Sequence, residues 1–427
     1  PEINGLYQFI NQQFLIEEFP EVEWVNREDD MGLEGLRKAK SSYNPADYAR
    51  KYLVEQLLDG KKGYRWAEQI GNTISGSRIE YLSDDDKSDT ERLWHSCFPE
   101  DSEQFVRYYY SEKTKDNRIL VKNDNGLIIS MTQLNPYRVR VKGQDVDTYY
   151  VVGVATEESH RREGHFRDVF LRMMQDMNHE QVPFVFLMPA DERIYLPLDF
   201  AYISELPVLS LTESAGERLA AMDCRDNEED CEKAAQYMEQ WLAGRYDMYC
   251  RRDGAYVSRL IKELESEDGA LQFLFNEELV AGLAARWGAG RKEQRLLYTD
   301  EQFTEEIKRK PAIMARLTCA ETFLSLFRLR EAGKELQIKI KIEDDILDAV
   351  NGSYIWKLSD SGSSAVRAEA EWHREDGETL CITPGALIGW LCGYRKLEET
   401  HRELSVELME KLAQIETVNQ AFIDEIV

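Results

Sequence analysis

The sequence has no apolar run close to the roughly 20 residues that a membrane-spanning helix needs, and no secretory signal peptide opens it. These absences predict a protein without membrane insertion, located in the cytoplasm. No extended low-complexity segment divides the chain, which favours packed domains over domains on flexible linkers. Since 427 residues exceed what one hydrophobic core usually serves, we expect about two to four domains.

Metal-ligand spacings are also missing from the sequence. The six histidines are dispersed without a His-Glu-x-x-His motif, and the seven cysteines include no Cys-x-x-Cys pair. An odd number of scattered cysteines does not suit a disulfide framework either. We therefore predict no metal site, and free thiols in a reducing compartment.

Positive charge is scarce in this chain. Lysine and arginine number 53 against 80 aspartates and glutamates, which gives a formal net charge of −27. Such a chain should repel nucleic acid and attract cations to an acidic cleft. This balance is compatible with a polyamine, an aminoglycoside or a lysine side chain as ligand. The alternative is that the acidity serves solubility alone.

The most informative stretch that is present covers residues 149–172, YYVVGVATEESHRREGHFRDVFLR. It predicts an apolar strand, a polar turn with the pattern Arg161-x-x-Gly164-x-Phe166, and an amphipathic helix. A helix N-terminus offers unpaired N–H groups and partial positive charge, which suits a diphosphate. Gly164 permits close backbone approach, and Arg161 and Arg162 add charged donors. An ordinary helix start with exposed arginines is the alternative.

This turn resembles the acetyl-coenzyme A loop of the GCN5-related N-acetyltransferases (GNAT), whose pattern is Gln/Arg-x-x-Gly-x-Gly/Ala. Phe166 stands where that family usually has Gly or Ala. The resemblance implies that the loop, including His165, binds the diphosphate of acetyl-CoA. For His165 a solvent-exposed turn histidine is the alternative. It also implies that the backbones of Val152 and Val154 flank the pantetheine arm.

A tyrosine downstream completes the resemblance. Residues 182–190, VPFVFLMPA, form an apolar run of strand length, and a short helix-like segment leads from it into another strand. Tyr195 and Phe200 fit the family pattern Tyr-x-x-x-Gly-Phe, with Asp199 in place of Gly. A phenol can protonate a departing thiolate, because its reference pKa of about 10 exceeds that of a thiol near 8.5. An ordinary half-buried tyrosine is the alternative.

Several further stretches resemble the Eis (enhanced intracellular survival) branch of the GNAT acetyltransferases, among them LNPYRVRV, FLMPADERIYLPLDFAYI and VNQAFIDEIV. The resemblance implies a mixed α+β fold: a catalytic GNAT domain over residues 76–210, a degenerate GNAT-like copy over 211–309, and a sterol-carrier-protein-like domain over 310–427. It further implies that the chain's terminal carboxylate, on Val427, enters the active site, and that the protein forms a homo-oligomer, a hexamer in that family.

Two parts of the chain carry separate predictions. Residues 1–75 resemble the closing part of a phosphatidylglycerol lysyltransferase-like domain, itself of GNAT type, which suggests a piece of a longer fusion. Residues 310–427 should open with Pro311 and a helix over AIMARLTCAETFLSLFRL, followed by alternating strands and the helix TPGALIGWLCGY. The family resemblance favours a structural role for this domain, and lipid binding in an apolar cavity is the alternative.

The predicted activity is acetyl transfer from acetyl-CoA to a primary amine in a ternary complex. Tyr195 would be the acid, and the Val427 carboxylate the candidate base or the group that orients the acceptor. One rival is a binding protein that uses coenzyme A or lipid as a ligand. Another is an aminoacyl or lysyl transferase that employs residues 1–75.

Overall fold

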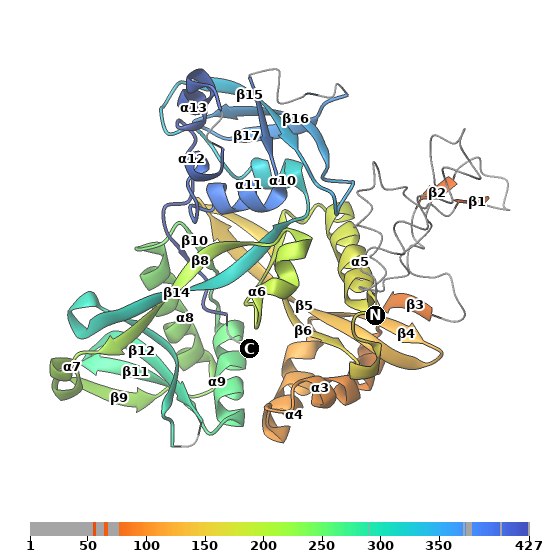
Figure 1. Ribbon diagram of the computed structural model, residues 1–427. Helices are drawn as coiled ribbons and strands as arrows, with labels where there is room; N and C mark the ends of the chain where they lie inside the picture. The colour runs from red at the N-terminus through yellow and green to blue at the C-terminus, as the bar shows by residue number, and fades with distance from the viewer. Residues whose placement is uncertain are drawn as a thin grey trace, which may run out of the picture.

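The computed structural model describes residues 54–56, 64–66, 77–288, 290–369, 372, 378–401 and 404–425. The predictions for residues 1–53 and for Val427 lie outside these ranges. Figure 1 shows three regions around a shared centre: the first carries α3 to α5, the second α7 to α9, and the third α10 to α13. Two short strands, β1 (Val54–Gln56) and β2 (Tyr64–Trp66), pair with each other.

A nine-stranded sheet forms the centre, in the order β19-β10-β5-β6-β7-β14-β8, with β4 and then β3 attached to β5. The Asn125-Gly126 turn between β4 and β5 has φ values of 52° and 89°, as a tight hairpin requires. The strands are β3 Ser77–Tyr81, β4 Arg118–Asp124, β5 Leu127–Val141, β6 Gln144–Thr156, β7 Phe184–Leu187, β8 Ala201–Leu211, β10 Met248–Cys250, β14 Thr304–Leu317 and β19 Ala421–Phe422.

Helices cover both faces of the first part of this sheet. The helices α3 (Glu91–Cys97) and α4 (Glu103–Glu112) share one apolar cluster with Ile119 and Val121 of β4. The helix α5 (His165–His179) shares another with Leu120. Because successive strand residues point to opposite faces, α5 lies on the face opposite α3 and α4. The predicted amphipathic helix after the Arg161 turn is therefore present and packed.

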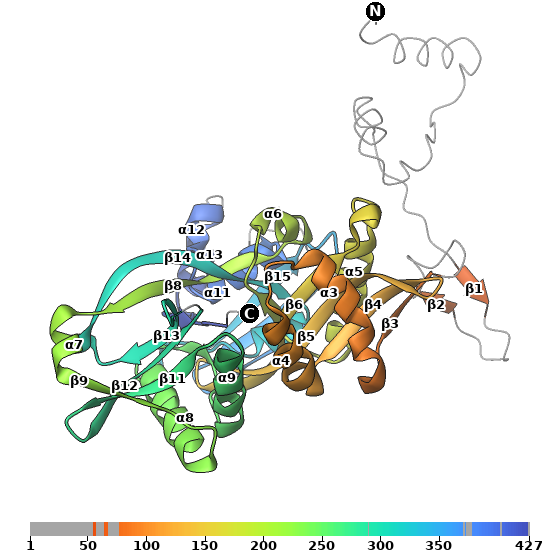
Figure 2. The ribbon, with the colours of Figure 1, turned by 90° about the horizontal axis from the view of Figure 1, so that it is seen from below.

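The second region has a four-stranded sheet in the order β13-β12-β11-β9, from β9 Leu219–Asp223, β11 Ala270–Asn276, β12 Leu279–Trp287 and β13 Glu293–Thr299. The helices α8 (Glu228–Ala243) and α9 (Gly254–Ser266) bury their apolar faces against it. Figures 1 and 2 both show α9 beside α4 of the first region. The two regions therefore meet along these helices.

The third region combines the sheet β17-β16-β15-β18 with short helices. Its members are β15 Glu335–Ile342, β16 Gly352–Ser359, β17 Ser363–Arg367, β18 Thr379–Ile382, α10 Ala320–Leu324, α11 Pro384–Leu391, α12 Leu397–Thr400 and α13 Val406–Leu412. The remaining helices are short: η1 Asp84–Thr90, η2 Lys113–Lys115, η3 Glu158–His160, α6 Glu192–Tyr195, η4 Leu196–Leu198, α7 Glu213–Arg218 and η5 Glu301–Phe303.

The predicted long helix after Pro311 is wrong. Residues up to Leu317 belong to β14, and the helix is limited to α10. The half of β14 that follows Pro311 is buried between β7 and β8, and a continuous apolar run is compatible with a buried strand or a buried helix. The pairing register shifts between Pro311 and Ile313, where a residue without an N–H can be accommodated. The boundary predicted between residues 309 and 310 thus falls inside a strand.

No helix in the described part of the chain is long and apolar enough to cross a membrane. All seven cysteines are described, and each is a free thiol, as predicted. Six of them are buried, and Cys97 is partly exposed.

Candidate active site and acceptor pocket

The strands β6 and β7 pair only briefly and then separate. Their parallel register consists of Tyr149 opposite Val185 and Tyr150 opposite Phe186. Beyond Tyr150, β6 continues to Thr156 with β5 as its partner in the described sheet. We call this opening the fork. One edge of β6 is left available there to pair with another extended chain.

A bulge lies on β6 within the fork. Val152 pairs with Gln133 and Ala155 with Met131, so two residues of β6 lie opposite one residue of β5. Gly153 has φ +57°, and a Cβ there would lie 2.9 Å from Trp94 Cζ3. Glycine is required for both reasons. Bulges change the direction of a strand's backbone groups, and here the change falls on the stretch from Val152 to Val154.

The predicted phosphate loop ends at the start of α5. Gly164 adopts a left-handed conformation with φ +87° and precedes a helix whose N-terminus has no side-chain cap. Arg162 also has positive φ, at +70°. The loop therefore places exposed residues and the uncapped first amides of a 15-residue helix shortly after the end of β6. This is the arrangement that suits an anionic ligand.

The side chains of this loop differ in what they contact. The Nε of Arg161 donates to the Thr156 carbonyl at 3.1 Å, and its Nη2 lies 3.8 Å from Cys97 Sγ. His165 pairs through Nε2 with Glu163 at 3.1 Å, whereas its Nδ1 is buried without a hydrogen-bond partner. Phe166 packs inward, with its ring centroid 4.4 Å from that of Phe170. The aromatic residue at the position usual for Gly or Ala thus fills space inside the fold.

Tyr195 is the last residue of α6 and lies in an apolar environment. It is 7% exposed, and the rings of Phe166, Phe170 and Phe200 lie within 6.2 Å of its own, centroid to centroid. Burial raises the pKa of Tyr195 to about 12. The phenol is therefore protonated at neutral pH. Its contact with Phe166 brings the predicted tyrosine and the predicted loop together.

The segment after Tyr195 is held by the third region. Asp199 has φ +57°, a left-handed conformation that Gly adopts most readily, and its Oδ2 accepts a hydrogen bond from Gly385 N of α11 at 2.8 Å. Buried Arg316 donates from Nε to the Leu198 carbonyl at 2.7 Å and forms an ion pair with Asp344 at 2.7 Å. Asp199 and Arg316 therefore fix the backbone next to Tyr195.

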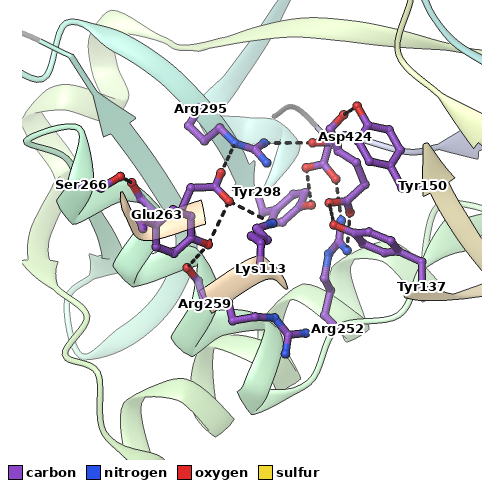
Figure 3. Close-up of polar contacts among 12 residues, drawn as sticks. Lys113, Tyr137, Tyr150, Arg252, Arg259, Glu263, Ser266, Arg295, Tyr298 and Asp424 are labelled. Atoms are coloured by element: carbon purple, nitrogen blue, oxygen red, sulfur yellow. Dashed lines mark hydrogen bonds and ion pairs between the residues drawn. The ribbon is translucent and has the colours of Figure 1, made fainter. Parts of the chain in front are cut away.

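A second polar group, which we call the seam, joins the first region, the second region and the end of the described chain. Buried Arg252 forms ion pairs of 2.7 Å with both Asp424 and Glu425. Figure 3 shows Asp424 in contact with both Tyr298 and Arg295: the Tyr298 hydroxyl donates to Asp424 Oδ2 at 2.5 Å, and Arg295 Nη1 donates to the Asp424 carbonyl at 2.9 Å. The seam consists of Tyr137, Arg252, Arg295, Tyr298, Asp424 and Glu425.

The carboxylate of Glu425 is charged in this environment. Burial alone would raise its pKa, but the Arg252 guanidinium and a hydrogen bond from the Tyr137 hydroxyl outweigh burial and lower the pKa. The backbone carbonyl of Glu425 accepts from Tyr150 at 3.2 Å. Because Tyr150 lies where β6 and β7 part, the seam reaches the fork directly.

A pocket of about 760 Å³ lies against the seam. Thr148 and Tyr149 line it from β6, Tyr256 and Glu263 from α9, and Glu425 from the end of the described chain. The pocket therefore lies between the first and second regions, next to the strands that form the fork.

Tyr195 and the loop lie beside the fork, and Val152 and Val154 are on its exposed strand edge, whereas Val427 lies outside the described residues. Sequence reasoning missed the seam. Its signals were weak: the Asp-Glu pair within the apolar AFIDEIV, the Arg-Arg-Asp at 251–253, and Tyr137 within LNPYRVRV.

Family comparisons agree with this geometry. Residues 78–203 match the family model described as an acetyltransferase (GNAT) domain, and residues 320–427 match that of a sterol carrier protein domain. Residues 1–55 match the C-terminal part of phosphatidylglycerol lysyltransferase. The chain thus carries a GNAT acetyltransferase domain, so the predicted enzyme class, an acyltransferase, is confirmed at the level of this domain. No curated protein matched the chain.

Solved structures share the fold. A conserved protein of unknown function from Enterococcus faecalis V583, described as a probable N-acyltransferase, matches with a TM-score of 0.68 at 12% identity, over 83% of this chain and 100% of that one. A GCN5-related N-acetyltransferase from Kribbella flavida matches with a TM-score of 0.64 at 13% identity, over 82% of this chain and 98% of that one. Eis1 from Mycobacterium abscessus matches with a TM-score of 0.57 at 10% identity, over 82% of this chain and 100% of that one. The predicted mixed fold with GNAT and sterol-carrier-like parts is confirmed.

Proposed function

We propose that this protein is an acetyl-CoA-dependent N-acetyltransferase that transfers acetyl to a primary amine by direct transfer in a ternary complex. The observation that carries this proposal is the fork, which leads into an uncapped helix start and has a protonated tyrosine beside it. A domain that only packs against its neighbours has no need for an open strand edge, a left-handed glycine and a buried phenol in one place.

The residues present fit acetyl-CoA as the acyl donor. The free edge of β6 near Val152 and Val154 can pair with an extended amide chain such as pantetheine. The amides of α5 after Gly164, with Arg162 and His165 nearby, suit the diphosphate. Arg161 would either keep its bond to Thr156 or turn toward the ligand.

Each chemical role follows from position. The acceptor amine loses a proton and attacks the thioester carbonyl, and backbone N–H groups of the Val152–Val154 stretch stabilise the developing oxyanion. The C–N bond forms, the C–S bond breaks, and Tyr195 gives its proton to the leaving thiolate. We assign the Val427 carboxylate to orienting the acceptor and taking its proton. That the chain runs through the seam as far as Glu425 supports this assignment.

The test is release of coenzyme A thiol from acetyl-CoA in the presence of a panel of amines. Tyr195→Phe should lower kcat about 10²-fold, the low end of what a positioned acid contributes. Tyr202→Phe is the matched control, since burial likewise raises the pKa of Tyr202 to about 12 but Tyr202 stands on β8. Full turnover by Tyr195→Phe would remove the acid from the proposal. Absence of both turnover and coenzyme A binding would instead favour the scaffold alternative.

The role of Val427 and the assembly need separate measurements. A variant extended by a few residues beyond Val427 should lose turnover while keeping coenzyme A affinity, because the added residues displace the carboxylate. Full activity of the extended variant would contradict this role. We also propose a homo-oligomer, with the hexamer of the resembled family as the expectation, and a cytoplasmic location. Light scattering on the purified chain measures the former.

A further inference from the structure

The charges around the pocket do not follow those of the chain. Its lining holds six carboxylates and an equal number of arginines and lysines, although the whole chain carries a net charge of −27. The carboxylates are Asp116, Asp145, Asp147, Asp253, Glu263 and Glu425. A cleft built for a polycation would be expected to keep an excess of unpaired carboxylates.

The lining carboxylates already have partners. Asp145 contacts Arg251 at 2.5 Å, Asp147 contacts Arg138 at 2.8 Å, and Asp116 contacts Arg259 at 3.7 Å. Glu263 lies 3.1 Å from Lys113 Nζ, Glu425 pairs with Arg252, and Asp253 accepts from the Tyr256 amide at 2.7 Å. Little acceptor capacity is left for a second cation.

Three hydrogen-bond donors of the lining have no partner, whereas the lining acceptor Glu425 Oε1, which also makes no hydrogen bond, is ion-paired with Arg252 Nη1. Asn135 Nδ2, Arg252 Nε and Tyr256 Oη are buried without hydrogen-bond partners among the described residues. The three residues are 4%, 5% and 8% exposed, and all of them line the pocket. The Arg252 guanidinium lies 4.1 Å from the centre of the Tyr256 ring, so the two side chains are in contact. Buried donors without partners indicate a ligand with oxygen acceptors.

We propose that this pocket recognises the acceptor through a carboxylate, or another oxygen acceptor, carried on the same molecule as the amine. The acceptor class is therefore an amino acid or a peptide-like amine, and not a polyamine. This inference rests on the proposed function for the transfer step, but the binding it describes does not require turnover. Tyr150, whose hydroxyl bonds to the Glu425 carbonyl, connects the pocket to the fork where transfer would occur.

Three probes with the same diamine chain separate the possibilities. L-lysine carries a carboxylate, L-lysinamide an uncharged carbonyl, and cadaverine neither. We expect kcat/KM at least about 10-fold higher for L-lysine than for cadaverine, as a site built to bond a polar group rejects the analogue that lacks it. If kcat/KM for L-lysinamide equals that for L-lysine, the pocket recognises a carbonyl oxygen. If kcat/KM for L-lysinamide is close to that for cadaverine, the pocket recognises a carboxylate. Cadaverine equal to or better than L-lysine overturns the proposal.

Variants link this preference to the named donors. Tyr256→Phe removes only the hydroxyl and should lower the ratio of L-lysine to cadaverine about 5-fold, in line with the loss of one hydrogen bond. Asn135→Asp, which replaces a donor with a charge, should lower it further. Tyr237→Phe is the control, because its hydroxyl donates to the Ala281 carbonyl at 2.8 Å, away from the pocket. Unchanged ratios in both pocket variants would contradict the proposal.

Calorimetry on the full chain with coenzyme A keeps the two proposals apart. L-lysine should bind more tightly than cadaverine even in a preparation that transfers no acetyl group. Selective binding of L-lysine without turnover would therefore contradict the acetyltransferase proposal and support the pocket assignment. Turnover of cadaverine with no preference for L-lysine would support the acetyltransferase proposal and contradict the pocket assignment. Binding of neither probe, with no turnover of either, overturns the pocket assignment.

Discussion

The fork and the seam lie side by side but differ in the residues that form them. The fork combines an open strand edge, glycine backbone and a tyrosine among aromatic rings. The seam combines two arginines, two carboxylates and tyrosine hydroxyls, and all of its residues are buried except Tyr137, which is partly buried. The fork leaves space for a ligand, whereas the seam holds the regions that form the pocket. Changes at the fork should therefore reduce activity, and changes at the seam should reduce stability.

The largest effect should come from Arg252→Met. This change leaves Asp424 and Glu425 buried without their shared cation, which typically costs about 3–5 kcal/mol. Chemical denaturation followed by circular dichroism measures the loss. Arg138→Met is the control, since its pair with Asp147 is 62% and 78% exposed and exposed pairs contribute little to stability. Equal losses in the two variants would mean that the seam does not hold the regions together.

Gly153→Val should have the second-largest effect, and it should act on the fork. The new side chain would clash with Trp94 and adopt a left-handed conformation, at a cost of about 1–3 kcal/mol. Because the bulge would be lost, we expect kcat/KM to fall about 30-fold, equivalent to about 2 kcal/mol. Gly126→Val shares the positive φ but meets nothing within 4 Å. Similar activity in the two variants would show that the bulge has no part in catalysis.

Asp199→Ala should have a moderate effect at the contact between the fork and the third region. The variant leaves Gly385 N without its acceptor, and we expect a loss of about 1–2 kcal/mol of stability, together with reduced kcat from a displaced Tyr195. Asp199→Asn keeps an acceptor oxygen and tolerates the left-handed conformation. It should retain most of the activity. An Asn variant as impaired as Ala would exclude the hydrogen bond as the cause.

The smallest effect should appear in the acid stability of the seam. The folded-state pKa of Glu425 lies below its ordinary value of 4.5, so its contribution to stability is complete above that pH and is lost as the pH falls through the folded value. Melting temperatures measured downward from pH 6 should fall more steeply for the wild type than for Glu425→Gln. Identical slopes would place the relevant titration elsewhere.

The contrast also explains what the sequence predicted. The part of the site that begins at the fork is local: β6, the Arg161 turn and α5 are contiguous, and each has its own periodicity or turn signal. The Asn-Gly hairpin was predictable for the same reason. The seam joins Arg252 to Asp424, 172 residues apart, and Tyr137 to Glu425, 288 residues apart. No local pattern encodes such pairs, so the individual residues have ordinary sequence contexts.

The error at β14 has a related origin. After Pro311, AIMARL is buried on both faces and holds one charged residue, Arg316, and a strand buried on both faces has no alternation to distinguish it from a buried helix. Only its neighbours β7 and β8 decide between the two, and these come from residues more than 100 positions earlier. The acceptor role of Asp199 was likewise unpredictable, because it depends on Gly385 of the third region.

The order of strands in the central sheet has a consequence for how the protein is made. The strand β14 covers one side of β7, β10 covers one side of β5, and β19, at Ala421, pairs with β10. When residues 77–211 have left the ribosome, the sheet they form therefore has unpaired edges, because the partner strands are synthesised much later. Unpaired edges favour association with other chains. The GNAT region expressed alone should aggregate, and its folding during synthesis should finish only when the last strand emerges.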